Sequence, residues 1–457
     1  MDILRMLALA EGKTLEFKRD LSSPKPILRT LVAFANTAGG TLIIGKADDG
    51  ALVGVDDVLA AEERLASLIA DSIKPVMMPE IEAITVEGSA VLLVRVAHWP
   101  GPFYLKENGP VDGVYVRLGS TNRKADATML EELKRLHANS AFDQLPCAGT
   151  APDDLDKEAV LRWFTGKNRN MDAAALESLG ILVRHGSGRV VSNGGLILFG
   201  NAGVRQQCFP DARLSCARFR GIDKSEFIDR QEMGSLLDAV TDVPKFIARN
   251  TRLASRIAGM RRQDIPEYPV IAIREVLVNA LAHADYASIG MRILVSVFAD
   301  RLEIQSPGMF PFGMTLDDFK AGVSRIRNRV ICRVLHEAGL MEQWGSGYQR
   351  IVNTCTAERY PEPEWQELGA CVRVIFRPHP DVPVNEPVNE PVNEPVNERQ
   401  RWFIAQLQRG RQVNADDIVS QWRISLATAK RDIASLREKE LIEFVGPAKT
   451  GSYRLKT

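Results

Sequence analysis

Residues 31–45 read LVAFANTAGGTLIIG and place an apolar segment, two glycines and a β-branched run in succession. Apolar residues at helical spacing predict a helix over 26–36, and Gly39-Gly40 ends it because glycine adopts the left-handed conformation that closes helices. The run at 41–45 predicts a strand. Outward from this stretch we expect a helix at 3–10, a strand at 14–18, a turn at 48–50 and a strand at 52–55. This alternation indicates an α+β domain.

The composition limits what kind of protein this is. A chain of 457 residues exceeds what one hydrophobic core usually spans, so about three domains are expected. Lys+Arg and Asp+Glu balance at 58 each, so any nucleic-acid surface must be local. The six cysteines show no zinc-site spacing. No stretch approaches the ~20 apolar residues of a membrane span, so we expect a cytoplasmic protein without a membrane partner.

Repeats and broken periodicity predict the domain boundaries. Four consecutive copies of PVNE occupy residues 383–398, and their prolines predict an extended tether. We divide the chain into a first domain at 1–137, a helical connector at 138–190, a middle domain at 191–380, a linker at 381–398 and a C-terminal domain at 399–457. At the start of the middle domain, LILFG (196–200) and RLSCARFRG (213–221) predict two strands.

Four segments of the first domain carry a family resemblance: the stretch at 31–45, LEFKRD (15–20), DDGALVGV (48–55) and YVRLGSTNRKA (115–125). Together they resemble the Schlafen-type AlbA-like domain over residues 11–135. The resemblance implies a nucleic-acid-associated domain and, in some relatives, a ribonuclease that holds Mg²⁺ or Mn²⁺ on three carboxylates.

Glu11, Glu16 and Asp48 stand where those three carboxylates would fall. Clustered carboxylates can hold a divalent ion that activates water beside a phosphate. In the alternative interpretation Glu11 is a solvated loop residue, Glu16 pairs with Lys18 or Arg123, and Asp48 caps its own turn. Lys46-Ala47 replaces the apolar residue and acid that are more usual in the family, which argues against a metal site.

A basic cluster follows the strand expected at 113–119. Its charged members are Arg117, Arg123 and Lys124, interspersed with Ser120, Thr121 and Asn122. These donors can grip the phosphate oxygens of a nucleic acid such as RNA. A solvated turn is the alternative.

The middle domain contains AIREVLVNALAHADY at 272–286, whose apolar residues share one face of a helix. Glu275 and Asn279 are four residues apart and project from one stripe of it. This pattern resembles the N-box of the GHKL ATPases and implies a GHKL-like α/β sandwich. The resemblance also implies that Asn279 coordinates the magnesium of Mg-ATP and that Glu275 positions the attacking water as the catalytic base.

The glycines after this helix extend the resemblance. Alternating apolar residues around Asp300-Arg301 predict an antiparallel hairpin. Gly345-Ser346-Gly347 precedes a helix and would present backbone N–H groups to a phosphate. Ser306-Pro307-Gly308 occupies the strand end where full GHKL ATPases carry an Asp that binds the adenine amino group. Gly308 is a candidate nucleotide-binding residue. The missing Asp argues against adenine selectivity and against hydrolysis.

The C-terminal domain holds the charge asymmetry, with twelve Lys/Arg against six Asp/Glu over 399–457. Helices are expected at 401–408, 416–422 and 425–440, followed by a hairpin at 442–455. This order resembles a winged helix-turn-helix, whose third helix enters the major groove. Thr428 is the candidate for a base edge, and Lys430, Arg431, Lys449 and Arg454 are candidates for phosphates. The alternative is a winged helix used for protein contact or dimerisation.

These segments predict an α+β multidomain protein with an AlbA-like domain, a GHKL-like ATP-binding domain and a winged helix-turn-helix. We expect a nucleic-acid-binding, nucleotide-responsive transcriptional regulator that binds DNA through its C-terminal domain, as a homodimer. The enzyme alternative is a Schlafen-like metal-dependent ribonuclease acting on structured RNA. A third hypothesis is that the middle domain hydrolyses ATP.

Overall fold

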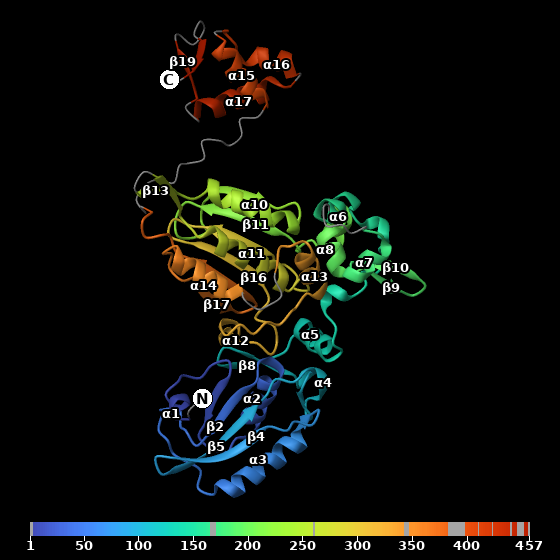
Figure 1. The fold of residues 1–457 in the computed structure, drawn as a ribbon, viewed down its shortest axis with the longest axis vertical. Helices are drawn as coiled ribbons and strands as arrows, with labels where there is room; N and C mark the ends of the chain where they lie inside the picture. Colours follow the sequence, from blue (N-terminus) through green and yellow to red (C-terminus); the bar gives the residue numbers. More distant parts are fainter. Residues whose placement is uncertain are drawn as a thin grey trace. The chain divides into compact units, whose positions relative to one another are not determined.

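The computed structural model describes residues 3–164, 171–258, 261–341, 347–382, 398–409, 411–422, 424–438, 441–445 and 452–455 (Figure 1). They form two compact units, Met1–Val388 and Asn389–Thr457, each considered by itself below. Within the described ranges no helix combines the length and the apolar character needed to cross a membrane.

The first domain is built on a mixed four-stranded sheet in the order β1-β2-β5-β4. β1 (Leu15–Lys18) runs parallel to β2 (Gly40–Ile44), and β5 (Ser89–Val96) runs antiparallel to β2 and to β4 (Glu80–Val86). Helix α2 (Pro24–Thr37) precedes β2 and buries most of its second half. The helix and strand predicted from the opening stretch are therefore both present, and the helix begins two residues earlier than predicted because proline is tolerated in a first helical turn.

The hairpin of β7 (Tyr115–Leu118) and β8 (Thr121–Lys124) is hydrogen-bonded to the C-terminal end of α2. The Asn36 amide donates to the carbonyls of Phe103 and Tyr115, both at 2.9 Å, and Thr37 Oγ1 accepts from the N–H of Arg117 at 2.8 Å. The other elements of this domain are α1 (Ile3–Leu7), α3 (Val58–Ser72), β3 (Ile73–Lys74), β6 (Tyr104–Leu105), α4 (Gly109–Asp112) and α5 (Ala127–His137).

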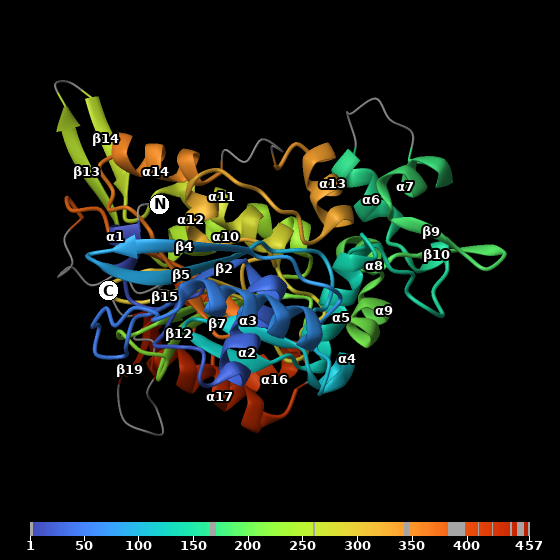
Figure 2. The same ribbon diagram turned by 90° about the horizontal axis from the view of Figure 1, so that it is seen from below.

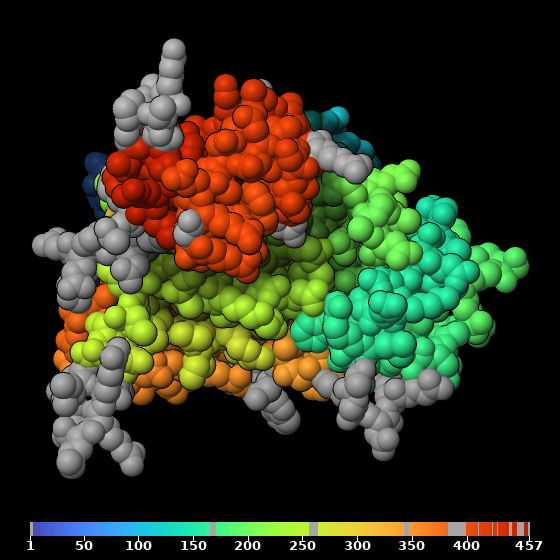
Figure 3. All heavy atoms as spheres, turned by 90° about the horizontal axis from the view of Figure 1, so that it is seen from above, coloured from blue at the N-terminus to red at the C-terminus, as the bar shows by residue number. Residues whose placement is uncertain are grey.

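The connector contains helices, as predicted, but also a hairpin. Its elements are η1 (Phe142–Gln144), η2 (Pro152–Asp154), α6 (Lys157–Phe164), α7 (Ala173–Leu179), β9 (Leu182–His185) and β10 (Gly188–Val191). Figure 3 shows this region as a lobe beside the middle domain.

Two predicted strands are absent. The run at 196–200 lies in helix α8 (Asn193–Phe199), where Ser192 Oγ accepts from the N–H of Gly195 at 3.0 Å and every residue is buried. A short apolar run buried on all sides carries no periodicity that separates helix from strand. The strand predicted at 52–55 is reduced to one bridge between Leu52 and Lys46.

The middle domain is a six-stranded sheet in the order β12-β11-β15-β16-β18-β17, with α10, α11 and α14 over one face (Figures 1 and 2). The predicted hairpin is present as an antiparallel β15–β16 pair. The elements are α9 (Ala202–Cys208), β11 (Leu214–Phe219), β12 (Phe227–Glu232), α10 (Leu236–Arg249), β13 (Leu253–Ala258), β14 (Arg261–Pro266), α11 (Val270–His283), β15 (Ile293–Val297), β16 (Leu302–Pro307), α12 (Leu316–Lys320), α13 (Arg329–Glu337), α14 (Gly347–Ala357), β17 (Glu364–Leu368) and β18 (Cys371–Phe376).

Asp143 of η1 fastens the connector to α13. Its carboxylate accepts from the N–H groups of Arg329 at 3.0 Å, Val330 at 2.6 Å and Ile331 at 2.9 Å. Burial raises the pKa of Asp143 to about 6, against these three donors, which favour the carboxylate. One side chain thus satisfies the orphan donors of a helix that begins 186 residues later.

The second unit contains α15 (Glu398–Gln408), α16 (Ala415–Trp422), α17 (Leu426–Glu438), β19 (Ile442–Val445) and β20 (Ser452–Leu455). The last two strands pair antiparallel. Phe403, Ile418, Ile433 and Leu436 meet in its core. The order of three helices and a hairpin follows the prediction.

Replacing Asp143 by Ala should lower the free energy of unfolding of the first unit by ~3 kcal/mol, because two buried N–H groups and one part-buried N–H group lose their acceptor. Urea unfolding of the full chain measures this loss. The control is Asp153→Ala, which removes an exposed carboxylate that pairs with Lys157 and should cost at most ~1 kcal/mol. Equal midpoints for the two variants would contradict the assigned role.

Candidate functional site

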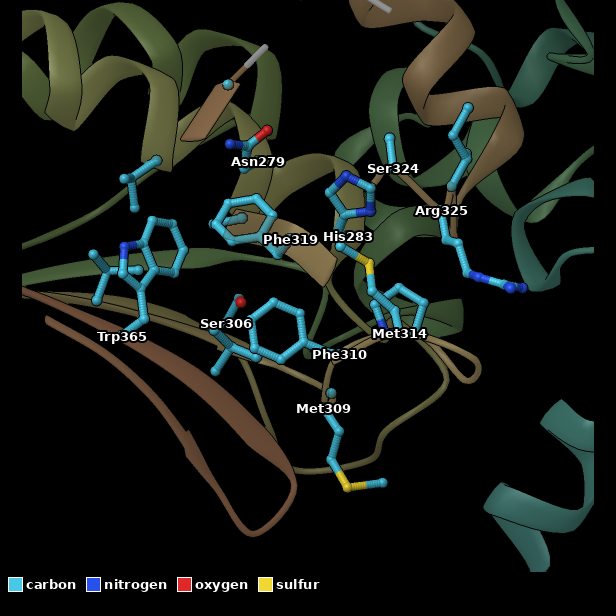
Figure 4. Close-up of a pocket in the computed structure, with 18 of the residues that line it drawn as sticks. Asn279, His283, Ser306, Met309, Phe310, Met314, Phe319, Ser324, Arg325 and Trp365 are labelled. Atoms are coloured by element: carbon cyan, nitrogen blue, oxygen red, sulfur yellow. The ribbon is translucent and has the colours of Figure 1, made fainter. Parts of the chain in front are cut away.

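The middle domain contains a cavity of about 110 Å³ between α11, α12 and the sheet (Figure 4). Most of its wall is apolar. The polar and charged lining residues are Glu275, Asn279, His283, Ser306, Ser324 and Arg325. An apolar pocket with few convergent polar groups is the usual form of a small-molecule site.

Three separate segments bring the predicted nucleotide residues to this cavity. Glu275 and Asn279 lie one turn apart on α11, and Gly347 begins α14 above them. A Cβ at position 347 would lie 2.8 Å from Glu275 Oε1 and 3.3 Å from Asn279 Nδ2, so only glycine fits without displacing them. Glu275 Oε2 lies 3.3 Å from Arg350 Nη1. Gly345, also predicted here, lies outside the described residues.

Gly308 also lines the cavity, directly after β16. Its φ of +92° and the Arg327 guanidinium, which a Cβ would overlap, both require glycine. Ser306 lines the cavity where the family's adenine-binding Asp is missing. The strand end therefore offers a hydroxyl instead of a carboxylate.

An aromatic cluster fills part of the cavity, and the sequence reasoning missed it. The Phe319 ring centroid lies 4.7 Å from that of Trp365, 5.4 Å from that of Tyr348 and 5.8 Å from that of Phe310. In Figure 4 the Phe319 ring lies in the middle of the pocket. Small-molecule sites usually measure ~300–1,000 Å³, so α12 and Phe319 must move before a nucleotide fits. The sequence shows aromatic residues at 310–319 and at 365, but it does not show that their side chains converge.

His283 belongs to the wall of the same cavity. Burial, and secondarily the charge of Arg327, lowers its pKa to about 4, so the ring is neutral at pH 7. In the described structure its Nδ1 is buried without a hydrogen-bond partner. A bound ligand with a donor or acceptor at this point would satisfy that atom.

In the first domain Glu16 is buried in ion pairs. Its Oε2 pairs with Arg117 Nη2 and its Oε1 lies 2.5 Å from Lys18 Nζ. Arg117 is itself 0% exposed and donates from Nε to the Gly12 carbonyl at 3.0 Å and from Nη1 to Asn122 Oδ1 at 2.9 Å. This corrects the prediction that Arg117 contacts nucleic acid, because its donors are used inside the domain. The pairing of Glu16 with Lys18 agrees with the structural alternative.

The three predicted metal ligands do not meet. Glu11 Oε1 accepts from the N–H of Phe17 at 2.9 Å, and Asp48 is exposed. The turn is capped by Asp49, whose Oδ1 accepts from the N–H of Ala51 at 3.0 Å, and not by Asp48. In the described ranges no group of three His, Cys, Asp or Glu side chains could hold a metal ion. The ribonuclease interpretation therefore gains no geometric support.

The predicted nucleic-acid-binding residues that are exposed form two sets. Arg123 and Lys124 are exposed on β8, and Lys124 pairs with Asp112. In the second unit Lys430 and Arg431 are exposed on α17 and Arg454 is exposed on β20. Lys449 lies outside the described residues.

Thr428 stands in the first turn of α17. Ser425 Oγ accepts from its N–H at 3.2 Å and caps the helix, and the two hydroxyls lie 2.9 Å apart. Thr428 is half-buried, so a base contact would require this hydroxyl pair to open.

Comparison with known families agrees with this division. Residues 11–126 match the family described as "Schlafen, AlbA_2". The chain contains a Schlafen AlbA_2 domain. Residues 290–376 match the family described as "Putative ATP-dependent DNA helicase recG C-terminal", so a RecG-like C-terminal ATPase domain follows it. The two matched stretches suggest a nucleic-acid-associated, ATPase-like protein.

Two solved structures are similar to the chain. A crystal structure of a protein from Corynebacterium diphtheriae is 19% identical over 99% of this chain and 98% of that one, with a TM-score of 0.41. The N-terminal domain of a RecG-related protein from Nitrosomonas europaea, solved by NMR, is 29% identical over 27% of this chain and 92% of that one, with a TM-score of 0.22. No curated protein matches the chain.

The RecG-like match includes Gly308 and Gly347, whereas Glu275 and Asn279 of α11 precede it. The cavity therefore lies mostly within the RecG-like domain and takes one wall from the helix before it.

Replacing Arg117 by Met should destabilise the AlbA_2 domain by ~3–5 kcal/mol, since Glu16 stays buried without its main partner. Thermal unfolding of the full chain measures the effect. Arg123→Met, an exposed site of the same hairpin, should change stability by less than ~0.5 kcal/mol. The double variant Glu16→Gln/Arg117→Met should regain part of the loss, and a double variant no better than Arg117→Met alone would argue against the pair.

Proposed function

We propose that this protein is a nucleotide-responsive transcriptional regulator that binds DNA through its C-terminal unit. The observation that carries the nucleotide part is the meeting of Glu275, Asn279, Gly308 and Gly347, from three segments, around one cavity. The AlbA_2 and RecG-like domains supply the association with nucleic acid.

The residues of the cavity fit the phosphate end of a magnesium nucleotide. The Asn279 side-chain oxygen would hold Mg²⁺, which takes its other ligands from phosphates and water. Bound magnesium would neutralise phosphate charge there. The N–H groups at the start of α14, next to Gly347, favour an anion because a helix N-terminus carries partial positive charge.

The rest of the cavity wall favours a flat ring. Phe310 and Trp365 supply aromatic faces, and Ser306 supplies one hydroxyl in place of a carboxylate. A hydroxyl can donate or accept, so Ser306 distinguishes adenine from guanine less strictly than an Asp would. Binding without rapid hydrolysis follows, because Glu275 is also paired with Arg350.

The DNA part rests on the second unit. Residues 399–457 carry twelve Lys/Arg against six Asp/Glu, and Lys430 and Arg431 are exposed on the third helix of the unit. Such residues bind phosphates and fix the orientation of a helix in the major groove. A homodimer on a palindromic site is expected.

Replacing Phe319 by Ala should tighten the binding of Mg-ADP about tenfold, since the wild-type ring must leave its stacked position at a cost of ~1–2 kcal/mol. Quenching of Trp365 fluorescence on titration with Mg-ADP reports the affinity. Phe319→Leu should lie between the two, and Asn279→Ala should weaken binding in either background. An unchanged affinity for Phe319→Ala would show that the ring does not obstruct the site.

Replacing both Lys430 and Arg431 by Ala should weaken the full chain's binding to duplex DNA and lower the slope of log affinity against log salt by about 2, since each phosphate contact releases about one counterion. Fluorescence anisotropy with a labelled duplex at several salt concentrations measures both, with and without Mg-ADP. The control Lys157→Ala/Arg162→Ala removes equal charge from α6 and should leave the slope unchanged. Equal slopes for the two double variants would contradict DNA binding through α17.

A further inference from the structure

A second cavity of about 230 Å³ lies between α5, the start of the connector and the segment that precedes α13. Its lining comes from α5 of the first domain, from the segment 140–142 and from the segment 325–329 that precedes α13. It shares Pro311, Arg325 and Ile326 with the nucleotide cavity, so the two are neighbours with different walls.

The charge of this second cavity is positive. Four arginines line it, Arg135, Arg325, Arg327 and Arg329, against the acids Glu132 and Asp285, which leaves a net charge of +2. Both acids are already engaged. Glu132 lies 3.2 Å from Arg327 Nε, and Asp285 accepts from Ser288 Oγ at 2.7 Å and from the N–H of Ala287 at 3.0 Å.

Two residues of the segment 325–329 are hydrogen-bonded to the neighbouring backbone. Arg327 donates to the carbonyls of His283 at 2.8 Å and Met309 at 2.9 Å. Asn328 is 1% exposed and donates to the carbonyls of Ala282 and Ala284. These bonds anchor the backbone that carries Arg325.

Two of the arginines are not neutralised. In the described part of the chain Arg325 and Arg135 have no carboxylate within the 4.0 Å of an ion pair, and Arg135 instead lies over the Phe142 ring at 5.7 Å. Arg325 is exposed, and burial and then the charge of Arg325 lower the pKa of His98 in the first domain. A guanidinium without an acid is a ready donor fork for phosphoryl oxygens.

We propose that this cavity binds a small phosphate-bearing ligand, with Arg325 and Arg135 donating to its phosphoryl oxygens. The enclosing walls and a volume of about 230 Å³ suit a diphosphate group and not a polynucleotide, which needs an open groove. Because α5 precedes the RecG-like match and the segment 325–329 lies within it, the anion would bridge two distant parts of the chain. Glu275 and Asn279 do not line this cavity, so its anion binding can be tested separately from nucleotide binding in the cavity of about 110 Å³.

Isothermal titration and thermal unfolding of the full chain with sodium pyrophosphate test this proposal, against sodium chloride at equal ionic strength. Wild type should bind with one ion per chain and unfold at a higher temperature in its presence, because a ligand of the native state alone stabilises it. Arg135→Ala/Arg325→Ala should bind at least about tenfold more weakly. Arg325→Lys keeps the charge without the fork and should lie between them.

The controls separate this site from others. Lys157→Ala/Arg162→Ala removes the same charge elsewhere and should bind pyrophosphate as wild type does, and Asn279→Ala should too. Unchanged binding by Arg135→Ala/Arg325→Ala overturns the proposal, and so does loss of pyrophosphate binding in Asn279→Ala, which would assign the anion to the nucleotide cavity. An effect of the arginine pair on single-stranded RNA binding, with none on pyrophosphate, would replace the small ligand by nucleic acid.

Discussion

The loop between β16 and α12 is the constraint on which the first unit depends. It leaves the sheet at Gly308, lines the cavity of the middle domain, and packs Met309 and Phe312 against Val114, Val116, Leu130 and Leu133 of the first domain. The N–H of Gly313 donates to the Thr37 carbonyl at 2.5 Å at the end of α2. A single apolar loop therefore belongs to the cavity wall and to the core of the neighbouring domain, and it cannot shift in one without disturbing the other.

Polar contacts fix the same junction from two sides. Glu367 of β17 accepts from Lys13 Nζ at 2.8 Å and from the N–H of Phe310 at 3.0 Å. One carboxylate therefore joins the first domain, the edge strand β17 and the loop. On the other side Arg327 reaches Glu132 of α5 and the Met309 carbonyl. If a ligand enters the cavity by displacing Phe319, which follows this loop by a few residues, the AlbA_2 contacts are the first that it can alter. This gives a physical route by which nucleotide could influence nucleic-acid binding without a contact between the two ligands.

The glycine and arginine residues show what the sequence could indicate about side-chain surroundings and what it could not. Gly308 and Gly347, which the sequence singled out, both line the cavity, and a Cβ at either position would lie too close to the side chain of Arg327 or Glu275. Arg117 was misassigned to a nucleic-acid surface, because a basic residue beside other basic residues carries the same sequence signal whether its side chain points out or into the domain. Its partner Glu16 is 101 residues away, which no local pattern reveals.

The sequence by itself determined the order of the elements, since helical spacing, β-branched runs and glycine stops are local properties: the helix at 24–37, the hairpin at 293–307 and the three helices and hairpin of the C-terminal unit all follow from it. Only the tertiary structure decided which side chains converge. Glu11 and Glu16 are near each other in sequence but make separate contacts, whereas Phe319 and Trp365 meet across 46 residues and Arg135 and Arg325 line one cavity across 190. The reason is physical: burial and ion pairing depend on packing between distant segments, and a side chain's neighbours along the chain do not record them.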